Sequence, residues 1–226
     1  MGGWDLKRLF AFILIISVSL SLLVFSLEYN SYNKTFYLRA YERYGVLETT
    51  GKSLDELELI TIDIIEYLKG NGGNELLAPH FNEKEVMHMV DVQELFDMAR
   101  VIKYVSLTIS AFIIVYYIAN KLQLYLAKIL SLGLFLNHAL IIFLIALIST
   151  NFNKYFTIFH EIFFANDLWI LNPRTDLMIQ MLPEPFFSTI GLRIGLSFLI
   201  FLSIIQIGAY LYIRKGAKYG GKIREI

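Results

Sequence analysis

Two histidines stand in segments that could perform acid–base chemistry. His88 lies in "FNEKEVMHMVDV" and His160 in "TIFHEIFFANDLW", each among large apolar side chains. Imidazole titrates near pH 6.5, so one histidine can hold a proton while another accepts one. The chain has no cysteine and no G-x-S-x-G sequence, which makes a protein nucleophile a poor explanation. These residues favour general acid–base catalysis, with His88 and His160 as the candidate catalytic pair.

Each histidine has an acidic neighbour. Asp91 follows His88 by three residues, which on a helix is close enough to orient the imidazole. Glu161 follows His160 directly and is the second candidate orienting residue. Neither histidine belongs to an H-E-x-x-H zinc motif, because "HEIFF" lacks the second histidine. The sequence therefore shows no zinc motif at either histidine, and acid–base chemistry by this pair would need neither a metal nor a cofactor.

The segment that carries His160 is rich in aromatic side chains. Its apolar core, "YFTIFHEIFF", is only ten residues long, which is too short to span a membrane. Pieces of this kind usually lie in the membrane interface, where aromatic rings commonly form a belt. In the loop that follows, "LNPRTDLMIQMLPEPFF", prolines at 173, 183 and 185 exclude a continuous helix. The candidate substrate-binding residues are Phe156, Phe159, Phe163, Trp169 and Arg174, although for Arg174 a structural pairing, with Asp176 or with charges of the cap, is the favoured interpretation.

The composition indicates what must position these residues. The chain of 226 residues is 56% hydrophobic, with a mean hydropathy of +0.56, which is too apolar for one soluble domain. About 20 apolar residues form a helix that crosses the hydrocarbon core. The first uncharged run, Leu9 to Leu27, exceeds the apolar region of a signal peptide and is interpreted as an uncleaved anchor. We predict an all-α membrane protein with four transmembrane helices, at 9–27, 104–120, 129–149 and 194–213, the last starting as early as 186.

Positive charges beside the spans predict the orientation. Lys7, Arg8, Lys121, Lys128 and the basic tail up to Arg224 fall on one side of a four-span arrangement, and such charges stay in the cytoplasm. Both termini are therefore predicted to be cytoplasmic, and both histidine segments extracellular. The expected division is 1–27, cytoplasmic N-terminus and first span; 28–103, a mainly helical extracellular cap; 104–149, second and third spans; 150–187, an extracellular interfacial loop; and 188–226, fourth span and cytoplasmic tail.

Two helices are expected in the cap. Ser53 and Glu56 form a capping box at the start of the first, which should end at Gly70. Asn82 and Glu85 repeat the pattern at the start of the second, which carries His88. If this second helix were straight, its rise of about 1.5 Å per residue would hold His88 roughly 24 Å above the membrane entry near Tyr104. A site that acts on a lipid then predicts a bend between 96 and 103.

Three other polar residues have structural and functional interpretations. His138 lies beside Asn137 within the third span, where a polar residue is a functional candidate, but an interhelical hydrogen bond is favoured. His80 is predicted to be a loop residue. Arg193, near the outer end of the fourth span, either extends toward the headgroups or neutralises an acidic residue of the cap.

The segments "FNEKEVMHMVDV" (81–92) and "FHEIFFANDLWILNPRTDLMIQMLPEPFF" (159–187) resemble the bacterial integral membrane family of lipoprotein intramolecular transacylases. "TGKSLDELELITIDIIEYLKG" also resembles the cap helix of that family, so the resemblance extends over most of the chain. The resemblance implies four transmembrane helices with an extracellular cap. His88 and His160 match the two catalytic histidines of the family.

The resemblance also implies the reaction. The sn-2 acyl chain of the diacylglyceryl-modified N-terminal cysteine of a lipoprotein moves to the α-amino group of the same cysteine, which leaves a lyso-form lipoprotein. The expected enzyme is an acyltransferase of the bacterial plasma membrane, acting by histidine acid–base catalysis without a cofactor. Its expected partners are diacylglyceryl lipoproteins and membrane lipid, with no nucleic acid, and the chain is expected to be a monomer.

Two other classes of protein remain open from the residues alone. A metal-dependent membrane hydrolase would require His88, His160 and an acid such as Asp91 or Glu161 to converge on one ion. A non-catalytic cap or sensor protein would need neither histidine for chemistry.

Overall fold

The structure is a computed structural model that describes residues 3–222, so Arg224 of the predicted tail lies outside the described residues. Every regular element in that range is a helix. The chain forms two compact units. The membrane unit comprises Met1–Ser26, Val101–Ile145 and Gly195–Ile226, and the cap unit comprises Leu27–Arg100 and Ala146–Ile194.

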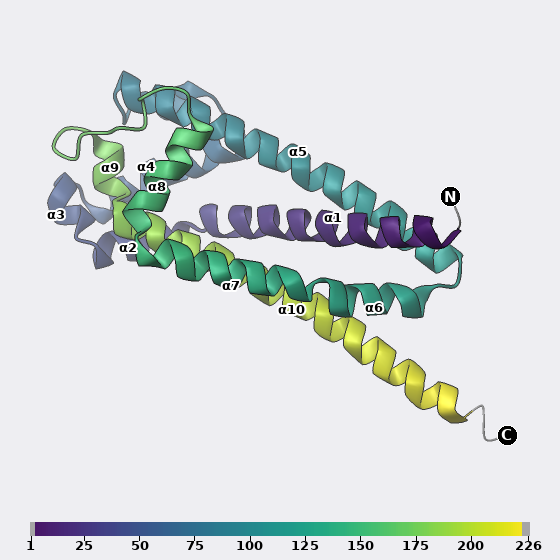
Figure 1. Cartoon of the computed structure of the whole chain (residues 1–226). Coiled ribbons are helices and arrows are strands. Elements are labelled where there is room, and N and C mark those ends of the chain that lie inside the picture. Colours follow the sequence, from purple (N-terminus) through teal and green to yellow (C-terminus); the bar gives the residue numbers. More distant parts are fainter. Residues whose placement is uncertain (1–2, 223–226) are drawn as a thin grey trace. The chain divides into compact units, whose positions relative to one another are not determined.

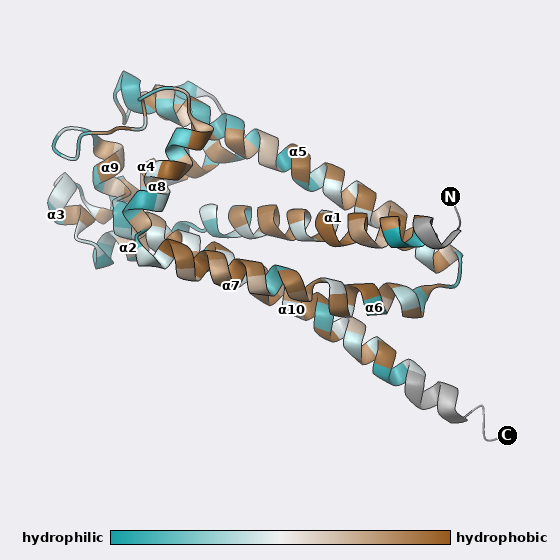
Figure 2. Ribbon diagram, viewed as in Figure 1, coloured by the Kyte–Doolittle hydropathy of each residue, from teal (hydrophilic) through white to brown (hydrophobic). Residues whose placement is uncertain are grey.

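Four helical segments are long and apolar enough to cross a membrane. They lie in α1 (Gly3–Ser31), in α5 (Glu83–Ala119), in α6 (Gln123–Gly133) together with α7 (Phe135–Thr150), and in α10 (Glu184–Lys222) (Figure 1). Figure 2 shows the hydrophobic residues that run along α1 and α7. The predicted all-α membrane fold with four spans is confirmed, and the fourth span begins early, at Glu184.

The third span is divided at Leu134, between α6 and α7. Gly133 precedes this point, and a Cβ atom there would lie 2.3 Å from the side chain of Ile15 on α1. Any other residue at this position would require the Ile15 side chain to move.

Polar contacts join helices inside the membrane unit. Asn137 donates to the hydroxyl of Ser19 at 2.6 Å, and His138 Nε2 lies 3.1 Å from Ser203 Oγ. These bonds tie α7 to α1 and to α10, as polar side chains commonly do between transmembrane helices. The favoured structural interpretation of His138 agrees with this contact. The apolar core around them consists of Leu14, Val18, Ile113, Tyr117, Ile129, Leu134, Phe198 and Leu202.

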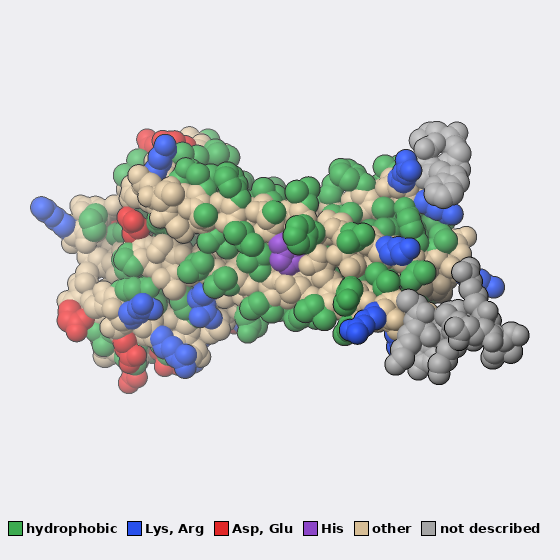
Figure 3. All heavy atoms as spheres, turned by 60° about the horizontal axis from the view of Figure 1, so that its bottom comes forward, with side chains coloured by type: hydrophobic (Ala, Val, Ile, Leu, Met, Phe, Trp, Pro, Cys, Tyr) green, Lys and Arg blue, Asp and Glu red, His purple; other side chains and the backbone are tan. Residues whose placement is uncertain are grey.

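The cap unit is built from short helices around its own core. These are α2 (Lys34–Arg43), α3 (Val46–Thr50), α4 (Leu54–Lys69), the 3-10 turn η1 (Asn74–Leu76), α8 (Phe152–Phe163) and α9 (Leu177–Met181), with the first part of α5. Helix α4 begins at the predicted capping box of Ser53 and Glu56 and ends at Gly70, whose φ of 79° is left-handed. All acidic residues except Asp5 and Glu225 belong to the cap unit, and Figure 3 shows them (red) over the cap elements.

The helix that carries His88 contains no break between 96 and 103, where the sequence predicted a bend. Helix α5 runs from Glu83 to Ala119 without interruption. The bend was expected because both histidines were placed at the lipid boundary. Within the cap unit, α8 packs beside α5 and brings His160 to His88.

Candidate active site

His88 is positioned by the first turn of α5. Asn82 and Glu85 form the predicted reciprocal cap, with the Asn82 N–H donating to Glu85 at 2.9 Å and the Glu85 N–H donating to Asn82 at 3.1 Å. Glu85 is 1% exposed, and its second oxygen accepts the N–H of Met178 at 2.6 Å. This carboxylate therefore ties the start of α5 to α9, one turn before His88.

His160 is positioned by α8. The helix begins at Asn151, whose side chain accepts the Lys154 N–H at 3.1 Å. His160 Nδ1 lies 2.7 Å from the carbonyl oxygen of Phe156, one turn earlier. Because a carbonyl only accepts, Nδ1 carries the hydrogen, and Nε2 of the neutral ring is the nitrogen that can take a proton.

The two imidazoles meet inside the cap unit. Their ring centroids are 6.0 Å apart, and the side chains of His88 and His160 are each 7% exposed. The Phe164 ring contacts both imidazoles, with its centroid 5.2 Å from His88 and 5.4 Å from His160. Among the residues that the structure describes, His88 Nδ1 has no hydrogen-bond partner. A buried polar atom without a partner is costly, which marks this nitrogen as a place for a ligand.

Aromatic rings surround His160. Phe156, Trp169 and Phe159 lie with ring centroids 4.2, 4.8 and 5.4 Å from the imidazole. Phe163 contacts Phe159 at 4.8 Å. Three of the four aromatic residues proposed from the sequence thus contact His160 itself.

Burial makes both histidines hard to protonate. His88 precedes the uncharged run of α5 that begins at Tyr104, so it lies in the cap portion of this helix. Burial, and then the nearby charge of His160, lower the pKa of His88 to about 4, while Asp91 opposes the shift. Burial also lowers the pKa of His160, opposed by its bond to Phe156. Both rings are therefore neutral at pH 7 and can act as bases.

The charged residues proposed from the sequence do not reach the imidazoles. Asp91 accepts a hydrogen bond from Asn166 at 3.0 Å, and no hydrogen bond joins it to His88. Glu161 is exposed on α8. Arg174 is exposed in the loop and, among the described residues, forms no ion pair with Asp176 or with another charge of the cap. Asp176 instead accepts from Asn82, from the Asn172 N–H and from Thr175.

Sequence reasoning missed Phe164 and Asn166 as parts of the site. Phe164 ends α8, and its N–H donates to the His160 carbonyl at 2.8 Å. Its position four residues after His160 places it on the same helix face, which was the available signal. Nothing in the sequence indicated that Asn166 would bind Asp91, because that contact joins two distant segments.

The remaining polar candidates have structural partners. His80 is a loop residue, as predicted, and its Nε2 lies 2.7 Å from Asp63. Arg193 lies 4.8 Å above the ring of Phe36 and donates to Asn30 at 3.3 Å, which neither sequence interpretation anticipated. In the part of the chain that the structure describes, no group of three or more His, Asp or Glu side chains is arranged to hold a metal ion.

Together, the fold and site define a polytopic, all-helical membrane protein whose cap encloses a pair of neutral histidines. The family model described as lipoprotein intramolecular transacylase Lit matches residues 12–187. The chain therefore belongs to the lipoprotein intramolecular transacylase family.

Solved structures of a relative agree with this assignment. The membrane integral lipoprotein intramolecular transacylase of Bacillus cereus is 26% identical and superposes with a TM-score of 0.84, covering 95% of this chain and 99% of the relative. A structure of the same protein with a histidine-to-arginine mutation is 25% identical and has a TM-score of 0.80, covering 96% and 95%. A third structure carries a histidine-to-alanine mutation and also has a TM-score of 0.80. No curated protein matches the chain.

Proposed function

We propose that this protein moves the sn-2 acyl chain of a diacylglyceryl-modified lipoprotein to the α-amino group of the same N-terminal cysteine. The observation that carries the proposal is the pair of neutral, enclosed imidazoles of His88 and His160, 6.0 Å apart. Membership of the transacylase family supports the substrate class. Such a pair suits a reaction that needs one proton removed and one proton delivered.

The proton transfers follow from the chemistry of the substrate. An α-amine with a pKa of about 7.7 to 8.0 is mostly protonated at pH 7 and must lose a proton before or during attack. Its nitrogen forms a bond to the ester carbonyl carbon and loses a second proton, the bond from that carbon to the glyceryl oxygen breaks, and the oxygen gains one proton, so one proton in total is released to solvent. Amine and ester belong to one molecule, so the reaction requires no second substrate and depends strongly on orientation.

The geometry favours different roles for the two histidines. His160 has its Nδ1 hydrogen fixed by the Phe156 carbonyl, so Nε2 is its basic nitrogen. We assign His160 as the base that takes the amine proton. His88 has an unpartnered Nδ1 and suits donation to the glyceryl oxygen or to the tetrahedral oxyanion. The surrounding aromatic rings exclude water, which would otherwise hydrolyse the ester.

The proposed setting is the bacterial plasma membrane, with both termini in the cytoplasm and the cap on the extracellular face. The basic residues at one end of the four spans, Lys7, Arg8, Lys121, Lys128, Arg214 and Lys215, support this orientation.

Mass spectrometry of a lipoprotein N-terminus tests the function. A cell that makes only diacylglyceryl lipoprotein should produce N-acyl, monoacylglyceryl cysteine when it expresses this chain. Release of free fatty acid without N-acylation would identify a hydrolase instead, and unchanged diacylglyceryl lipoprotein would remove the proposal.

A further inference from the structure

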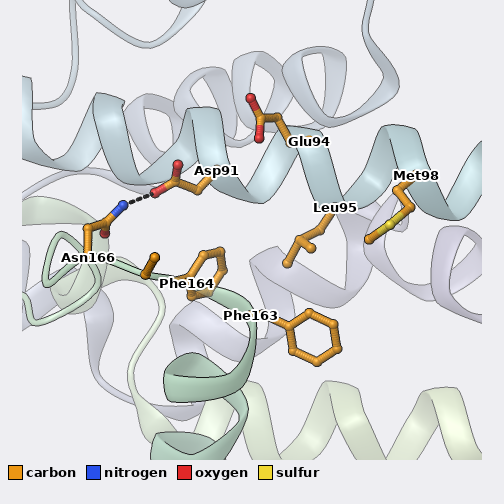
Figure 4. Close-up of a pocket in the computed structure, with 8 residues that line it drawn as sticks. Asp91, Glu94, Leu95, Met98, Phe163, Phe164 and Asn166 are labelled. Carbon is orange, nitrogen blue, oxygen red and sulfur yellow. Dashed lines mark hydrogen bonds between the residues drawn. The ribbon is translucent and has the colours of Figure 1, made fainter.

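A pocket of about 370 Å³ lies beside the histidine pair and is not used by the chemistry described above. Four residues of α5 form one wall, and the end of α8 with the residues after it forms the other (Figure 4). The volume falls in the usual range for small-ligand pockets. Its principal lining residues are Asp91, Glu94, Leu95, Met98, Phe163 and Phe164.

The pocket continues the helix face that carries His88. His88, Asp91, Leu95 and Met98 follow one another at intervals of three, four and three residues, so they form one stripe along α5. Phe164 lines the pocket and also contacts His88. The catalytic imidazole and the pocket are therefore consecutive parts of one surface and share the Phe164 ring as a wall.

The pocket is charged on one wall only. Asp91 and Glu94 are its acidic residues, whereas the opposite wall presents phenylalanine, alanine and asparagine side chains. Neither carboxylate forms an ion pair within the described part of the chain. Asn166 donates to one Asp91 oxygen at 3.0 Å, which holds this carboxylate in place (Figure 4). A cationic ligand is the complement of such a wall.

A second observation also indicates a ligand here. His88 is 7% exposed, yet among the described residues its Nδ1 has no hydrogen-bond partner. This nitrogen lies one turn from Asp91 on the same stripe. A ligand in the pocket would lie against the Phe164 ring, which the His88 imidazole also contacts.

We propose that the pocket binds the α-ammonium group of the substrate's N-terminal cysteine, with Asp91 and Glu94 as its counter-charges and Leu95, Met98 and Phe163 against the adjoining acyl hydrocarbon. This inference rests on the proposed function. It makes Asp91 a substrate-binding residue rather than the residue that orients His88. The amine is captured in its charged form, gives one proton to a neutral histidine and then attacks the ester as the free amine.

The subsite is tested by binding without turnover. A His160→Ala protein in bicelles is titrated with a synthetic diacylglyceryl-cysteine peptide, either with a free amine or with an N-acetyl group. The free amine should bind about tenfold more tightly, which corresponds to one charge-assisted contact. Adding Asp91→Asn and Glu94→Gln should reduce the preference to about twofold or less, because the counter-charges are then gone.

Glu83→Gln is the matched control, because Glu83 is an exposed acid of α5 outside the pocket and should leave the preference unchanged. Equal binding of both peptides, or a preference that survives in the Asp91→Asn, Glu94→Gln protein, would overturn the subsite. The proposed function is measured separately, as acyl transfer by the unaltered protein. If the protein transfers the acyl chain but shows no preference for the free-amine peptide, only the ammonium subsite is rejected. If it prefers the free-amine peptide but transfers no acyl chain, only the proposed function is rejected.

Discussion

The imidazoles of His88 and His160 lie with centroids 6.0 Å apart and share one wall, the ring of Phe164. They come from helices far apart in the chain, and both are buried and neutral at pH 7. This relationship makes acid–base catalysis possible without a protein nucleophile, and the following predictions depend on it.

Removing either imidazole should abolish acyl transfer. His88→Gln and His160→Gln each eliminate a titratable group, and we expect losses of at least about 100-fold in transfer rate. His138→Ala is the control, since His138 bonds to Ser203 in the membrane unit and should retain transfer within about threefold of the unaltered rate. N-terminal mass spectrometry measures all three. Full activity in either glutamine variant would contradict the assigned chemistry.

Removing the Phe164 ring, which contacts both imidazoles, should let water reach the histidine pair. Phe164→Ala removes the ring that contacts both histidines, and we expect roughly tenfold less N-acylation together with release of free fatty acid. Phe152→Ala is the matched control, because Phe152 contacts Phe156 but neither imidazole. If Phe164→Ala slows transfer without any hydrolysis, the ring serves packing rather than water exclusion.

The buried His88 should make the protein less stable in acid. Its pKa is about 4 when folded and about 6.5 when unfolded, so the unfolded chain binds more protons between these values. The free energy of unfolding therefore has its full value above pH 6.5. It decreases as the pH falls toward 4, by an amount on the order of 2 to 3 kcal/mol. Unfolding temperatures measured from pH 7.5 to 5 should therefore fall more steeply for the unaltered protein than for His88→Gln. Parallel curves would show that His88 titrates normally.

Glu85 should stabilise the cap through its two backbone contacts. Glu85→Gln leaves the N–H of Asn82 or of Met178 facing an amide NH₂ group, at a cost of about 1 to 3 kcal/mol. Glu83→Gln, on the exposed side of the same turn, should change stability by less than about 0.5 kcal/mol. Thermal unfolding in detergent compares the two variants, and equal effects would refute this role of Glu85.

The absence of native cysteine allows the orientation to be measured directly. Glu161→Cys, exposed on α8, should react with a membrane-impermeant maleimide in intact cells. Lys215→Cys, exposed on α10, should react only after permeabilisation, because positive flanks stay in the cytoplasm. The reverse pattern would show that the cap faces the cytoplasm.

Much of this protein was determined by the sequence itself, because the relevant signals are local. The four apolar runs reflect the length needed to cross hydrocarbon, and the caps at Ser53 and Asn82 are satisfied within one helical turn. His88 and His160 could be selected as candidates from their residue type and their apolar surroundings. Their aromatic neighbours were evident because three of them lie within nine residues of His160 along the chain.

Only the tertiary structure decided how these local features meet. It placed α8 beside an uninterrupted α5, joined Asp91 to Asn166 rather than to His88, and bound Asp176 to Asn82 rather than to Arg174. These contacts join segments distant in the chain, and their choice depends on the packing of the whole cap unit. A local pattern shows that a charged group needs a partner, but packing determines which partner it finds.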